Sequence, residues 1–107
     1  MYDFVLWLLP HTAKFSRAHR FTLGDRMETG ALEVLELLVE ASYARDKQDL
    51  LRRANLRLER LRYLTRLAKD LKLISVAQYE FASRAMLTVG SEIGGWEKQQ
   101  SRTRGGS

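Results

Sequence analysis

The sequence predicts an all-α fold, an up-down-up-down antiparallel four-helix bundle. Apolar residues recur at helical spacing through nearly the whole chain, so that each segment has an apolar face. Only 7 Gly and 1 Pro are present, too few turn-forming residues for an all-β fold. A length of 107 residues fits a single domain. We expect the bundle to span residues 2–98, followed by a disordered C-terminal tail at residues 99–107.

The first helix contains Pro10, which lacks a backbone N–H and should kink or restart the helix. The predicted inward face of this helix is Tyr2, Val5, Leu6, Leu9 and Ala13. Residues 16–21 are expected to connect it to the second helix. We expect Phe15, Phe21 and Leu23 to anchor this connection, and a buried Phe21 would make Phe21→Ala cost about 3 kcal/mol.

A capping pattern at Thr22 and Asp25 predicts the start of the second helix. Its inward stripe is Leu23, Met27, Ala31, Val34, Leu35 and Leu38. A second apolar stripe lies beside it, formed by Leu32, Val39 and Tyr43. Gly30 lies within this helix, where Gly costs about 1 kcal/mol relative to Ala. We expect Gly30 to allow the close approach of a neighbouring helix.

Start signals also precede the third and fourth helices. Asp46 with Asp49 precedes a helix expected over residues 47–72. Ser75 with Gln78 is a capping box before the last helix. The predicted inward residues are Ala54, Leu58, Leu61, Ala68 and Leu71 in the third helix, and Ala82, Met86, Val89, Ile93 and Trp96 in the fourth. Short links between long helices make them antiparallel neighbours.

The chain has more apolar residues than one bundle core needs. Those outside the main stripes include Leu32, Val39, Leu56, Tyr63 and Leu67. A second apolar stripe is typical of a subunit interface. We therefore expect the protein to associate with copies of itself.

Charge is unevenly distributed along the chain. Residues 45–72 carry ten Lys and Arg against four acidic residues, whereas residues 23–44 carry one Arg against five acidic residues. The surplus that gives the net charge of +5 therefore lies in one internal segment. This asymmetry favours a polyanion or an acidic protein surface as the partner.

The basic segment divides into two clusters on different sides of a helix, Arg53, Arg57 and Arg60, and Arg62, Arg66 and Lys69. Arginine suits bidentate contacts to phosphate, and phosphate neutralisation drives nucleic-acid binding without sequence readout. Composition alone fits equally well a solvated face paired with the acidic second helix. We expect the second cluster to pair with Glu33, Glu36 and Glu40, which leaves the first cluster free.

The chain lacks the residues that most classes of enzyme need for catalysis. The chain has no Cys and only His11 and His19, and it contains neither a Glu-x-x-His pair nor a His-Glu-x-x-His motif. Glycine-rich phosphate loops are also absent. We therefore expect no catalytic site, no metal and no cofactor.

The apolar start contains Asp3 and lacks a basic leading region, and no apolar run reaches transmembrane length. We expect a cytoplasmic protein without a membrane partner.

Four strings of residues carry a resemblance to a known family. They run from Trp7 to His11, from Lys14 to Arg26, from Arg52 to Leu64 and from Gly94 to Trp96. Together they resemble the accessory variability determinant (Avd) proteins of diversity-generating retroelements. These belong to a wider four-helix family that includes proteins encoded in 23S ribosomal RNA intervening sequences. The resemblance covers nearly the whole chain, from about residue 2 to residue 98.

The resemblance implies a non-catalytic accessory protein that assembles as a pentameric ring with a basic surface. Such a protein binds the reverse transcriptase of the retroelement together with RNA and DNA, takes no small-molecule substrate, and supports mutagenic retrohoming. The expected binding residues are Arg17, Arg20, Arg26, Arg52, Arg53, Arg57, Arg60, Arg62, Arg66 and Lys69. The alternatives are a protein of the ribosomal intervening-sequence type and a purely structural helical oligomer that binds no nucleic acid.

Overall fold

The computed structural model of the chain describes residues 1–105, and it describes side chains for residues 1–102. The elements in chain order are α1 (Tyr2–Thr12), α2 (Arg17–His19), the π-helix η1 (Arg20–Gly24), α3 (Asp25–Tyr43), α4 (Gln48–Asp70) and α5 (Val76–Gly105). No strand occurs in the described range. Since α2, η1 and α3 follow one another without a break, they form one continuous helical segment.

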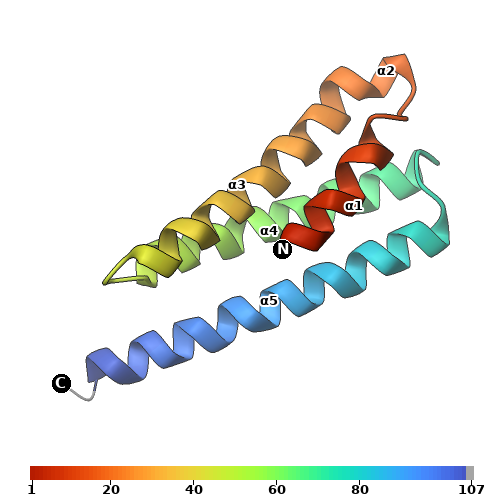
Figure 1. The fold of residues 1–107 in the computed structure, drawn as a ribbon. Helices are drawn as coiled ribbons and strands as arrows, with labels where there is room; N and C mark the ends of the chain where they lie inside the picture. The colour runs from red at the N-terminus through yellow and green to blue at the C-terminus, as the bar shows by residue number, and fades with distance from the viewer. Residues whose placement is uncertain (106–107) are drawn as a thin grey trace.

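The helices form the predicted up-down-up-down bundle (Figure 1). Helix α4 packs against α3 on one side and α5 on the other, and α1 lies on α3 and α5. The molecule is elongated, 53 × 22 × 19 Å. Helix α1 has 11 residues against 23 in α4, so it covers only part of the bundle's length.

The core confirms most of the inward residues predicted for the three longer helices. Ala54, Leu58 and Leu61 of α4 are fully buried, and Met86 and Ile93 of α5 are 1% exposed. The other predicted positions that are buried are Leu23, Met27, Ala31, Val34, Ala68, Ala82 and Val89. Leu35, Leu38 and Trp96 are half-buried against the core. The prediction for Leu71 is wrong, because it caps the C-terminus of α4, where the helix leaves the core.

The predicted inward face of the first helix is correct for Val5, and Leu9 is half-buried, but it is wrong for Tyr2, Leu6 and Ala13. The buried residues of α1 are Phe4, Val5, Leu8 and Thr12, whereas Tyr2 and Leu6 are exposed. Because residues 4–9 are all apolar, periodicity does not distinguish one face from the next. Helix α1 continues through Pro10, and the buried Thr12 hydroxyl donates a 2.6 Å hydrogen bond to Oε1 of Glu28 on α3.

The predicted connection at residues 16–21 is mostly helical instead. Ser16 precedes α2, and the π-helical turn η1 follows at once, so the pattern at Thr22 does not begin a helix. The Thr22 hydroxyl hydrogen-bonds the carbonyl of His19 instead. A π-turn adds a residue to the helical repeat and shifts the register of the side chains. Phe15 and Leu23 are buried as predicted, whereas Phe21 is 64% exposed.

The other two helix starts follow the sequence closely. Oδ1 of Asp46 accepts a 3.1 Å hydrogen bond from the backbone N–H of Gln48, the first residue of α4. Ser75 and Gln78 form the predicted capping box, in which each side chain accepts a hydrogen bond from the other residue's backbone N–H, at 3.0 and 2.8 Å. These motifs depend on a few neighbouring residues, which is why the sequence predicts them.

The expected tail is helical within the described residues, because α5 continues to Gly105. Gly94 and Gly95 do not interrupt it. Beyond them, Oε1 of Gln100 accepts a 3.3 Å hydrogen bond from the backbone N–H of Lys47, which ties the last turns of α5 to the start of α4. Residues 106–107 of the expected tail lie outside the described part of the chain.

Candidate nucleic-acid interface

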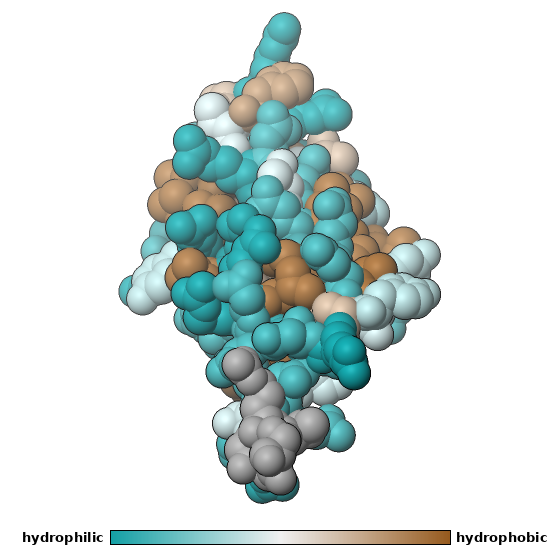
Figure 2. All heavy atoms as spheres, turned by 90° about the vertical axis from the view of Figure 1, so that its left-hand side faces the viewer, coloured by the Kyte–Doolittle hydropathy of each residue, from teal (hydrophilic) through white to brown (hydrophobic). Residues whose placement is uncertain are grey.

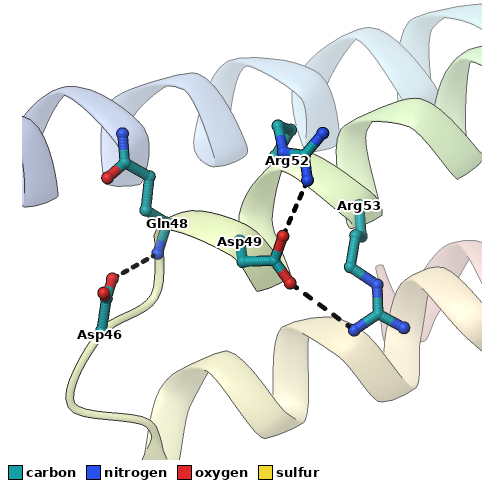
Figure 3. A network of polar contacts seen from close by, with 5 residues as sticks. All are labelled: Asp46, Gln48, Asp49, Arg52 and Arg53. Carbon is teal, nitrogen blue, oxygen red and sulfur yellow. Dashed lines mark hydrogen bonds and ion pairs between the residues drawn. The ribbon is translucent and has the colours of Figure 1, made fainter.

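Helix α4 presents its basic residues on two sides because it lies between α3 and α5. At its first turn, Oδ1 of Asp49 contacts Arg52 at 2.8 Å and Oδ2 contacts Arg53 at 3.9 Å. Figure 3 shows the single carboxylate between the two guanidinium groups. All three side chains are exposed, so these ion pairs are screened by solvent and salt.

Among the described residues, the acidic helix α3 pairs with one arginine of the first basic cluster and with none of the second. Nε of Arg57 lies 3.1 Å from Oε2 of Glu33 on α3, and the Arg57 side chain is 29% exposed. The prediction that Arg62, Arg66 and Lys69 pair with Glu33, Glu36 and Glu40 is therefore wrong. Helical spacing places residues 53, 57 and 60 on one side of α4, but it does not say which neighbouring helix lies there.

The second cluster lies toward α5. Nε of Arg62 is 3.4 Å from Oε1 of Glu59, and its Nη2 donates a 3.2 Å hydrogen bond to the carbonyl of Met86. Lys69 pairs with the neighbouring Asp70, and its Nζ lies 4.7 Å from the ring centre of Tyr79 on α5. Within the described residues, Arg66 is exposed and has no ion pair.

The segment of α2 and η1 adds basic residues next to an exposed ring. Arg17 and Arg20 are exposed and have no carboxylate partner among the described residues, and the guanidinium of Arg20 lies 5.6 Å from the ring centre of Phe21. π-Helical turns often occur at functional sites. Arg17, Arg20 and Phe21 therefore form an exposed basic and aromatic surface where the chain enters α3.

A hollow lies between α3 and α4, and we call it the Gly30 hollow. It has a volume of about 310 Å³. Its lining residues are Asp25, Arg26, Thr29, Gly30, Glu33, Arg57, Arg60, Leu61 and Leu64. The close helix approach expected at Gly30 is absent, because a Cβ there would lie 4.0 Å from the nearest atom, Cδ1 of Leu61. No pattern in the sequence predicted this hollow, although Arg26 and Gly30 are four residues apart and share a helix face.

The apolar residues predicted to lie outside the core are exposed. Their exposed fractions are 37% for Leu32, 52% for Val39, 55% for Leu56, 70% for Tyr63 and 46% for Leu67. Figure 2 shows hydrophobic patches among hydrophilic residues at the end of the bundle where α3 and α5 end. An open groove of about 500 Å³ also lies beside Met1, with Leu38 and Trp96 in its lining.

The described residues contain no group of three or more His, Cys, Asp or Glu side chains that could hold a metal ion. No helix in the described range is long and apolar enough to cross a membrane.

Comparison with known proteins identifies a family. The protein-family model described as bAvd-like matches residues 1–100, which include α1 to α4 and most of α5. No curated protein and no solved structure matched the chain. The family match agrees with the resemblance carried by the strings that begin at Trp7, Lys14, Arg52 and Gly94.

Proposed function

Since the chain belongs to the bAvd-like family, we propose that it is a non-catalytic accessory subunit of a diversity-generating retroelement. In this role it binds the element's reverse transcriptase and nucleic acid, either template RNA or its DNA copy, and supports mutagenic retrohoming. The expected binding residues divide into two groups. Arg52, Arg53, Arg57, Arg62 and Lys69 have carboxylate partners, whereas Arg17, Arg20, Arg26, Arg60 and Arg66 have none among the described residues.

The arginines of the second group are the observation that best supports nucleic-acid binding. Five exposed arginines without carboxylate partners lie on α2, η1, α3 and α4. An unpaired guanidinium is a ready partner for phosphate, and arginine forms bidentate contacts with it. Contacts of this kind release counterions, so affinity should fall steeply as salt concentration rises.

The experiment is a titration of labelled single-stranded RNA with the protein at several salt concentrations. Binding that weakens linearly on a log–log plot supports the proposal, with a slope that reports the number of phosphate contacts. Absence of binding at low salt would refute direct nucleic-acid binding. Co-purification with the reverse transcriptase of the same retroelement tests the protein partner separately.

The subunit also assembles with copies of itself, and we propose a ring-like homo-oligomer, a pentamer. The exposed apolar residues of α3 and α4 support association, whereas the number five rests on the family resemblance alone. Light scattering should give about five times the chain mass of 12.4 kDa. A monomer at micromolar concentration would refute the assembly.

A purely structural oligomer is the second candidate, and the five paired basic side chains favour it. In that case the Arg57–Glu33 contact between α4 and α3 would be the main use of the positive charge. This candidate predicts an assembled protein that binds no RNA even at low salt. The salt titration therefore distinguishes the two functions.

A further inference from the structure

The Gly30 hollow combines an apolar floor with a charged rim. Leu61 is fully buried and Leu64 half-buried, and Gly30 has no side chain to fill the space above them. A Cβ at Gly30 would meet Cδ1 of Leu61 at 4.0 Å, an ordinary van der Waals contact, so a methyl group fits there without a clash. The hollow's volume of about 310 Å³ lies at the small end of the range for ligand pockets, about 300–1,000 Å³.

The rim carries three arginines from two helices. Arg26 and Arg60 are exposed and have no carboxylate partner among the described residues. Arg57 is held by Glu33 at 3.1 Å, which fixes its guanidinium beside the hollow. The rim can therefore bind an anion through side chains whose positions come from both α3 and α4.

We propose that the Gly30 hollow is a nucleotide subsite, which takes one unstacked base of a single-stranded nucleic acid while Arg26 and Arg60, which have no carboxylate partner among the described residues, contact the flanking phosphates. This inference rests on the proposed function and names a site for it. The apolar floor fits the flat face of a base, and the arginine rim fits phosphate.

The two carboxylates of the rim favour a nucleotide over an acidic peptide. Asp25 and Glu33 line the hollow together with the arginines. Bases present N–H donors that a carboxylate can accept, as Asp and Glu do from the amino group of cytosine. The side chains of an acidic peptide present only more carboxylates, and like charges repel. A nucleotide therefore matches both signs of charge in the hollow.

The subsite should distinguish single strands from duplexes. In a duplex the bases are stacked and paired, and extruding one costs a few kcal/mol. A single strand has bases free to stack on or enter a protein surface. Phosphate contacts to the rim remain available to both forms, so the hollow adds affinity only for the single strand.

The test is Gly30→Leu, which fills the hollow and leaves every charge in place. Leu is also a better helix former than Gly, so the substitution favours the helical backbone. The matched control is Gly95→Leu on α5, because Gly95 is exposed and an added Cβ would meet no described atom within 4 Å apart from its chain neighbours and the backbone of its own helix. Both variants, and wild type, are titrated with labelled single-stranded and duplex RNA at several salt concentrations.

We expect Gly30→Leu to weaken single-strand binding severalfold, because the base loses its apolar contact with Leu61 and Leu64. Duplex binding and the log–log salt slope should stay unchanged because the phosphate contacts remain. Gly95→Leu should bind like wild type. Gly30→Ala adds one methyl group and should give a smaller loss, and it replaces the Leu variant if circular dichroism shows that variant to be unfolded.

Four results would overturn the subsite. Equal single-strand affinity of Gly30→Leu and wild type shows that the hollow is unused, while the proposed function stands. An equal loss for duplex RNA, or a changed mass in light scattering, shows that the hollow is a general or subunit contact. Displacement of RNA by a poly-glutamate peptide in wild type but not in Gly30→Leu assigns the hollow to an acidic peptide. Absence of RNA binding by wild type instead refutes the proposed function itself.

Discussion

Arg62 of α4 occupies the space in which a side chain at Gly90 of α5 would lie. A Cβ on Gly90 would be 2.7 Å from Nη2 of Arg62 and 3.6 Å from Cδ2 of Leu58. The same Nη2 donates a hydrogen bond to the carbonyl of Met86, one turn before Gly90. Gly90 thus lets a partly buried guanidinium cross from α4 to the backbone of α5.

This contact predicts whether Gly90→Ala raises or lowers the free energy of unfolding. In a plain helix the change would stabilise the protein by about 1 kcal/mol. Here the new methyl group displaces Arg62 and breaks a charged hydrogen bond, which contributes about 1.5–3 kcal/mol. We expect a net loss of about 1 kcal/mol in the free energy of unfolding, measured by urea denaturation.

The double mutant Arg62→Ala/Gly90→Ala tests whether Arg62 causes the loss of stability expected for Gly90→Ala. In the background of Arg62→Ala there is no guanidinium to displace, so Gly90→Ala should become stabilising by about 1 kcal/mol. The same effect of Gly90→Ala in both backgrounds would show that Arg62 moves aside without cost.

The backbone conformation of Lys72, at the end of α4, predicts that a glycine there would stabilise the protein. Its φ is 63°, the left-handed region that favours glycine, and it is the only non-glycine residue of the described chain with a positive φ. The hydrogen bonds Leu73 N to Ala68 O and Lys72 N to Lys69 O are those of a Schellman motif. Lys72→Gly should raise the free energy of unfolding by about 1 kcal/mol.

The control for this prediction is Lys72→Ala, which removes the charge but keeps a side chain in the left-handed region. It should change stability by less than about 0.5 kcal/mol. If Lys72→Ala stabilised the protein as much as Lys72→Gly, the charge and not the backbone would be responsible.

The features predicted correctly from the sequence are those set by local chemistry. The capping box at Ser75 and Gln78 needs only residues within one turn. The inward stripe of α4 was predictable because Ala54, Leu58 and Leu61 recur at helical spacing between charged residues. In α1 nearly every residue is apolar, so the packing against α3 and α5 determines which face is buried.

The wrong predictions at the candidate interface concern features that depend on how the helices pack against one another. The sequence shows that Arg57 and Arg62 point to different sides of α4, but the order of the helices decides which of them meets Glu33. The register shift at η1 exposes Phe21, and no pattern in residues 16–21 indicates a π-turn. The Gly30 hollow depends on the spacing of two packed helices.

Phe21 and Phe15 make a matched pair for testing the segment before α3. Phe15 is 5% exposed, so Phe15→Ala should cost about 3–5 kcal/mol of unfolding free energy. Phe21 is 64% exposed, so Phe21→Ala should stay within about 0.5 kcal/mol of wild type in thermal or urea unfolding. A large loss of stability in Phe21→Ala would place its ring in an interface between subunits.

The charge of Arg60 is available to a phosphate group. It is exposed, lies on the rim of the Gly30 hollow and has no carboxylate partner among the described residues. Arg60→Ala should weaken binding to single-stranded RNA of every sequence, because phosphate contacts carry no base information. The log–log salt slope should fall by about 0.7 for the one lost contact. Folding should be unaffected, since Ala is the best helix former and the site is exposed.

Two controls make the result interpretable. Arg84→Ala removes an exposed arginine from α5, away from the hollow, and should leave the salt slope unchanged. Arg52→Ala removes an arginine already paired with Asp49, and should lower the slope less than Arg60→Ala because this pairing competes with phosphate. If the three variants lowered the slope equally, net charge alone would govern binding, and the surface between α3 and α4 would have no special role.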